Sequence, residues 1–233
     1  MDFVEKLLEA DAHHLPMLRQ EIALSLQQNM TNRTPSLIAL MVIETSLGES
    51  SKARSLAESI WKTGEKFFNP LHELVYVNCL LDLAMLEMAA SLLKPRFERF
   101  FENLENFSAV FLKFAIMAGS TNLMEKVAVQ IEHGAIQDFV GILKVKQYEE
   151  HFKNIQKIAL NEVKDRLCGY HFDFYEDRGF PDLVITFALA PSVSSDEAIS
   201  IRQAMDNKLA EYYNSQSINR LNNLSIRAAR LEI

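Results

Sequence analysis

The most apolar stretch of the chain, which decides its fold, reads LHELVYVNCLLDLAMLEMAASLL over residues 71–93. Apolar residues fall on nearly every side of the helices that it predicts, so these helices need neighbours on both sides. Four polar residues interrupt the stretch and argue against a membrane span. They are Glu73, Asn78, Asp82 and Glu87. The stretch therefore predicts the buried centre of a helical array.

Signals for further helix pairs flank this stretch on both sides. Thr34-Pro35 and Asn69-Pro70 each combine a capping residue with a proline, which suits the first turn of a helix. Placing Gly48, Met85 and Gly119 in register gives a step of 37 residues from 48 to 85 and of 34 from 85 to 119. Helix-pair repeats of about that period are typical of solenoids.

Residues 34–134 resemble degenerate tetratricopeptide repeats. The large apolar, turn and small packing positions of that family are matched in the first pair by Leu37, Leu40, Gly48, Ala53 and Ala57. The later pairs match in part, through Leu74, Val77, Ala90, Phe111, Ala115, Gly119 and Ala128. Met85 replaces the turn glycine and Met124 replaces an alanine. The resemblance implies that the first helices of the pairs line a concave groove.

The first helices also carry polar residues, and the resemblance implies that some of them face the groove. These residues are Glu44, Thr45, His72, Glu73, Asn78, Asp82 and Lys113. Polar groups among so many apolar ones need water or a partner. We interpret this set as the candidate groove for a protein or peptide partner.

Residues 135–167 are predicted to form one long helix that connects the array to the rest of the chain, because apolar residues recur there every three to five positions. Cys168-Gly169 is expected to end this helix. A row of lysines lies on another side, at Lys146, Lys153, Lys157 and Lys164. The row suits an anionic partner, but Glu149 and Glu150 lie at helical pairing distance, and a solvated helix face explains the same pattern.

After Gly169 the apolar period changes to two, which is typical of strands. We predict two strands, a helix and a third strand, at residues 170–176, 183–189, 194–213 and 224–233. Ser194 and Glu197 have the spacing of a capping box at the start of the helix. The helical crossover predicts that the third strand lies parallel to the second, and a slip in alternation at Ala228-Ala229 predicts a bulge.

The predicted fold class is α+β and mostly α. A helical domain over residues 1–167, which begins with two helices in residues 2–30, is followed by a small β-β-α-β module over residues 168–233. So small a module has a marginal core. We therefore expect its helix to cover one face of the sheet, and the array or another copy of the chain to cover the other. A homodimer through this module is one of the open alternatives.

His171 and Asp173 are the weak candidates for catalysis. They share a strand face with Tyr175 and have side chains that bind metals or transfer protons, but a half-solvated strand also has a polar outer face. Cys79 and Cys168, the two cysteines, form neither a metal-type spacing nor a disulfide framework. No phosphate loop or nucleophile motif occurs, so we expect no metal or cofactor.

The chain is acidic, with 24 Lys and Arg residues against 31 Asp and Glu residues and a net charge of −7. Such a protein is repelled by nucleic acid and by anionic membranes unless its basic groups cluster. Arg220, Arg227 and Arg230 lack interleaved stacking aromatics and are a weak signal for nucleic acid. Because the N-terminus, MDFVEK, is acidic and amphipathic, it does not read as a signal peptide. We expect a cytoplasmic protein.

The sequence favours a non-enzymatic interaction protein, an adaptor or scaffold that binds a protein or peptide through the helical array. Two alternatives stay open. The first is an inhibitor or immunity-type protein for a single target, for which a net charge of −7 favours a basic surface. The second is an enzyme with its site at the junction of array and sheet, around His171 and Asp173.

Overall fold

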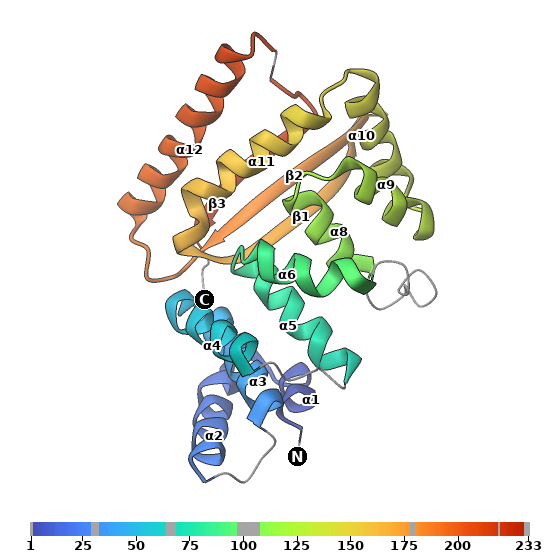
Figure 1. The fold of residues 1–233 in the computed structure, drawn as a ribbon. Coiled ribbons are helices and arrows are strands. Elements are labelled where there is room, and N and C mark those ends of the chain that lie inside the picture. Colours follow the sequence, from blue (N-terminus) through green and yellow to red (C-terminus); the bar gives the residue numbers. More distant parts are fainter. Residues whose placement is uncertain are drawn as a thin grey trace.

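The computed structural model describes residues 2–28, 33–63, 69–96, 108–177, 180–218 and 220–230. It is a mostly helical α+β fold in which a three-stranded sheet follows a series of helices (Figure 1). The helices are α1 (Phe3–Leu8), α2 (Leu15–Gln27), α3 (Arg33–Ser46), α4 (Ser50–Thr63), α5 (Pro70–Asp82), α6 (Leu86–Leu93), α8 (Ser108–Met117), α9 (Thr121–Gln130), α10 (Gly134–Val145), α11 (Glu149–Val163) and α12 (Ser195–Ser215). The strands are β1 (Leu167–Asp177), β2 (Phe180–Leu189) and β3 (Leu224–Arg230).

The predicted helix pairs are confirmed as α3–α4, α5–α6 and α8–α9, which pack as antiparallel neighbours. α5 lies between α3 and α8, as its apolar sequence requires. The side chain of Asn69 caps α5 by accepting a hydrogen bond from the amide of Leu71 at 2.9 Å. α3 begins at Arg33, so Thr34 lies inside that helix and is not its cap.

One type of turn ends many of these helices. The second residue after the helix adopts a positive φ, and the next amide donates to the carbonyl five residues back, which is the Schellman motif. The positive-φ residues are Gly48, Ala84, Gly119, Glu132, Gln147 and Ser217. In the second pair the amide of Met85 donates to the carbonyl of Leu80 at 2.8 Å, so Ala84 holds the turn position and the register predicted at Met85 is one residue late.

The single long helix predicted over residues 135–167 is wrong. Its apolar face continues, but the chain turns at Gln147, where φ is +57°, and the amide of Tyr148 bonds to the carbonyl of Leu143 at 2.8 Å. α10 and α11 are therefore separate helices, and α11 folds back across the sheet (Figure 1). Cys168 lies inside β1 instead of ending a helix, because that strand begins at Leu167.

The sheet has the order β1-β2-β3, with β1 antiparallel to β2 and β3 parallel to β2 as predicted. The predicted bulge at Ala228-Ala229 is wrong, since pairing is continuous from Leu224 to Arg230. A register shift occurs instead between Leu167 and Gly169, at the start of β1. Parts of the predicted hairpin connection (178–179) and of the last strand (231–233) lie outside the described residues.

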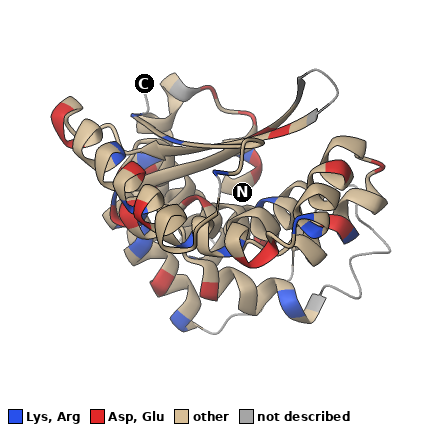
Figure 2. Cartoon of the chain, turned by 90° about the horizontal axis from the view of Figure 1, so that it is seen from above, with Lys and Arg blue, Asp and Glu red and all other residues tan. Residues whose placement is uncertain are grey.

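The two faces of the sheet differ in their burial. Phe187 and Tyr170 lie on the inner face, pack edge to face and are fully buried. His171, Asp173 and Tyr175 lie on the opposite face and are exposed. In Figure 2 the sheet is seen with most of the helices beneath it. α10 of the helical domain packs against β1 and β2, and covering of the outer face by a second copy stays a prediction.

Candidate binding groove

A groove of about 630 Å³ lies where the first helices of the pairs meet the beginning of the sheet. α3, α5 and α8 supply one side of it, and the start of β1 with the end of β2 supplies the other. Its lining is mainly apolar, with Leu71, Leu74 and Val75 from α5 as the half-buried central part. Helices thus form one side of the groove, and strands form the other.

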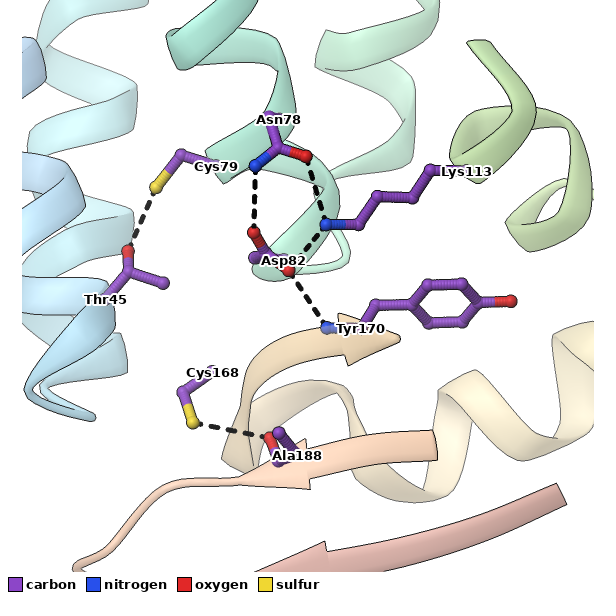
Figure 3. A network of polar contacts seen from close by, with 8 residues as sticks. All are labelled: Thr45, Asn78, Cys79, Asp82, Lys113, Cys168, Tyr170 and Ala188. Atoms are coloured by element: carbon purple, nitrogen blue, oxygen red, sulfur yellow. Dashed lines mark hydrogen bonds and ion pairs between the residues drawn. The ribbon is translucent and has the colours of Figure 1, made fainter. Parts of the chain in front are cut away.

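A polar network joins the array to the sheet beside this groove (Figure 3). The Lys113 ammonium on α8 donates to Asp82 Oδ1 at 2.7 Å and to Asn78 Oδ1 at 3.1 Å. The same Asp82 oxygen accepts a hydrogen bond from the backbone amide of Tyr170 at 2.9 Å. Only 11% of the Lys113 side chain and 17% of the Asp82 side chain are exposed. The carboxylate therefore fixes the end of α5 to β1.

Two thiols lie in the groove wall, and both are protonated at neutral pH. Burial raises the pKa of the Cys79 thiol to about 12, although a contact of 3.0 Å with the Thr45 hydroxyl acts in the opposite direction. Burial also raises the pKa of Cys168 to about 11, and its thiol lies 3.4 Å from the carbonyl oxygen of Ala188. Since the thiolate is the reactive form, neither group is prepared as a nucleophile.

Of the seven candidate groove residues, Thr45, Asn78 and Asp82 line the groove. The others do not line it. The Glu44 carboxylate binds the Arg19 guanidinium through two bonds of 2.7 and 3.0 Å. His72 Nε2 lies 2.7 Å from Asp2 Oδ2, Glu73 is buried, and Lys113 belongs to the network beneath the groove.

Sequence reasoning missed the apolar centre of the groove. Leu71, Leu74 and Val75 belong to a helix that is apolar on most sides, so its pattern could not separate the groove-facing side from the buried sides. The signal that could have found them is their position on the first helix of the central pair, where the tetratricopeptide resemblance implies a concave surface.

The two weak catalytic candidates share the outer face of β1, but only one of them reaches the groove. His171 lines the groove, and Asp173 does not. Within the described residues no three His, Cys, Asp or Glu side chains gather as metal ligands. The structure therefore brings only His171 to the junction of array and sheet.

The predicted lysine row is divided by the turn at Gln147. Lys153, Lys157 and Lys164 line a small groove of about 260 Å³ on α11 and its end, and Lys146 lies beyond the turn at the end of α10. The ammonium of Lys153 lies 3.5 Å from the Glu150 carboxylate. The charge row is therefore shorter than predicted and partly paired.

Two other grooves are of similar size. One of about 540 Å³ lies between α6 and α9 and is also apolar, and one of about 660 Å³ lies between α12 and β3 and is more polar. Ligand sites combine an apolar lining with a few convergent polar groups. The groove at the junction of array and sheet shows that combination most clearly, through Asn78, Asp82 and His171.

Comparisons with known proteins identify no relative of this chain. No helix in the described ranges is both long and apolar enough to cross a membrane. No family model, curated protein or solved structure matches this chain.

Proposed function

We propose that this chain is a non-enzymatic interaction protein of the cytoplasm, an adaptor or scaffold that binds a segment of a partner protein. The observation that carries the proposal is the groove of about 630 Å³ at the junction of array and sheet. Its volume lies within the range of about 300–1,000 Å³ that is usual for ligand sites. The degenerate tetratricopeptide resemblance agrees with a groove built from first helices.

The chemistry of the groove supports binding more than catalysis. Its thiols are protonated, with pKa values of about 12 for Cys79 and 11 for Cys168. The Asp82 carboxylate is paired with Lys113 and with a backbone amide. An apolar side chain of a partner would displace water from Leu74 and Val75 and gain roughly 25 cal/mol for each Å² of apolar surface removed from water.

No specific observation favours the two alternatives. An enzyme around His171 and Asp173 would need both side chains at one site, and only His171 lines the groove. An inhibitor or immunity-type protein would use its surface against one target, and the described surface does not single out such a target. Both remain outside the proposal.

The proposal can be tested with peptides selected from a random 12-residue display library against the full chain. Ala109 is an exposed residue of α8 that lines the groove, so Ala109→Trp fills the groove without altering the core. Val145→Trp is the matched control, because Val145 is 85% exposed and lies on α10. We expect Ala109→Trp to weaken binding at least tenfold and Val145→Trp to leave it unchanged. Equal affinity for both variants, or a library that yields no binder, would overturn the proposal.

A further inference from the structure

β1 is an edge strand, and one hydrogen bond shows which of its backbone groups point outward. The amide of Tyr170 donates to Asp82 on α5, so it points away from β2. In an antiparallel pair, hydrogen-bonded and non-hydrogen-bonded residues alternate. The amides and carbonyls of Phe172, Phe174 and Glu176 therefore also point away from β2, while the odd-numbered residues bond to it.

These outward groups form a free edge. Asp82 covers only the first of the outward positions, at Tyr170. No backbone or side-chain hydrogen bond joins the outward groups of Phe172, Phe174 or Glu176 to any described residue. Unpaired edges of this kind are templates for a further strand, and proteins usually block them. Here, within the described residues, Asp82 blocks the edge at Tyr170 alone.

The free edge leads directly into the groove. Gly169 and His171, at the beginning of the same strand, line the groove together with Asp82. α5 and α8 lie at this end of β1, on the side away from β2 and β3 (Figures 1 and 3). A second copy would bring its own sheet and helices toward this array, whereas one extended segment needs only the width of a strand, about 4.8 Å. The geometry therefore favours a peptide segment over a second copy.

We infer that the partner segment binds as an added β-strand on the outer edge of β1 and places an apolar side chain in the groove. This inference rests on the proposed function and adds the conformation of the partner. The segment would pair with Phe172, Phe174 and Glu176 in the mode of β-strand addition, in which main-chain bonds give affinity and side-chain pockets give specificity.

The negative charge beside the free edge indicates which kind of peptide segment would bind there. Asp173 is exposed near the middle of the free edge, and no ion pair joins it to another described residue. If the added strand runs antiparallel to β1, Asp173 occupies a position where cross-strand side chains approach most closely, because its own backbone bonds point toward β2. A chain with a net charge of −7 also attracts basic partners. The occupant is thus an extended peptide that carries Lys or Arg opposite Asp173 and a large apolar residue for the groove.

Amide hydrogen exchange measured by NMR tests this inference, with the full chain and the tightest peptide from the display library. We expect saturating peptide to slow exchange at Phe172 and Phe174 by about tenfold or more, because their amides gain a partner. His171 and Asp173 are the internal controls, since their amides already bond to β2. Unchanged exchange at Phe172 and Phe174 would overturn the inference.

Two variants separate this inference from the proposed function. Ala109→Trp weakens binding if the groove is used, whatever the conformation of the peptide. Asp173→Lys lies outside the groove and should weaken a basic peptide by about threefold to tenfold, with recovery when the peptide's basic residue is replaced by Glu. Suppose that Ala109→Trp weakens peptide binding, while Asp173→Lys has no effect and the peptide does not slow amide exchange at Phe172 and Phe174. The groove proposal would then stand, and strand addition would be overturned. A library without binders would overturn both.

Discussion

At the scale of single residues, the Asp82–Lys113 pair is the most consequential contact between array and sheet. Removing one partner of a buried ion pair costs about 3–5 kcal/mol, and slight exposure of both groups lowers the figure here to about 2–3 kcal/mol. We expect Lys113→Ala to lower the free energy of unfolding by that amount, measured by urea titration. Lys126→Ala, at an exposed position on α9, should change it by less than about 0.5 kcal/mol. Equal effects of the two variants would contradict the assignment.

The buried thiols predict a loss of stability at alkaline pH. An unfolded cysteine with the ordinary pKa of 9.0 loses its proton between pH 8 and pH 10, whereas folded Cys79 and Cys168 keep theirs until about 12 and 11. Because the unfolded chain then binds fewer protons, the free energy of unfolding falls as pH rises. The expected fall is about 1.4 kcal/mol per thiol over this range.

Urea titrations at pH 8 and pH 10 measure that difference. Cys79→Ala should reduce the fall by about 1.4 kcal/mol relative to the unmodified chain, and the variant with both cysteines replaced by about twice that amount. An identical pH dependence in all three proteins would show that the thiols ionise equally in the folded and unfolded states.

The partners of polar residues were the least predictable feature at this scale. Glu44 and His72 were expected to face a groove, but Arg19 and Asp2 in the N-terminal segment bind them. Helical spacing identifies which residues share a helix face, and it contains no information on which distant element covers that face. Asn78 and Asp82 line the groove, although they lie on the same helix as His72.

At the scale of elements, the turns between paired helices can be tested by opposite substitutions. Gly119 has a φ of +62°, and an added Cβ would lie 2.4 Å from the backbone of Lys153 on α11. We expect Gly119→Ala to destabilise the fold by about 2–4 kcal/mol. Ala84 has a φ of +54°, so Ala84→Gly should stabilise it by about 0.5–1 kcal/mol. Thermal unfolding measures both, and a stabilised Gly119→Ala protein would contradict the description of the turn.

The sequence predicted most elements because their signals are local. Alternating residues indicated β1 and β2, and the serine at position 194 accepts the bond from the amide of Glu197 at 3.1 Å that its spacing predicts. The break at Gln147 escaped prediction because a left-handed turn made by a residue other than glycine leaves no mark on the apolar pattern. The same reason explains the one-residue error at Ala84.

At the scale of the whole molecule, the groove arises where two separately predictable parts meet. The array supplies Leu74 and the sheet supplies His171, which are almost one hundred positions apart in the chain. Local patterns predict the array and the sheet separately, but they do not determine which edge of the sheet the array approaches. The bond from Tyr170 to Asp82 joins the array to the β1 edge of the sheet, and the outward backbone groups of β1 beyond Tyr170 have no hydrogen bond to a described residue.

The most direct test of the proposed function is a methyl NMR titration of the full chain with the tightest peptide from the display library. We expect the methyl groups of Leu74, Val75 and Val110 to shift, while those of Leu86 and Leu123 in the groove between α6 and α9 do not. Shifts confined to Leu86 and Leu123, or spread without relation to either groove, would contradict binding at the junction of array and sheet.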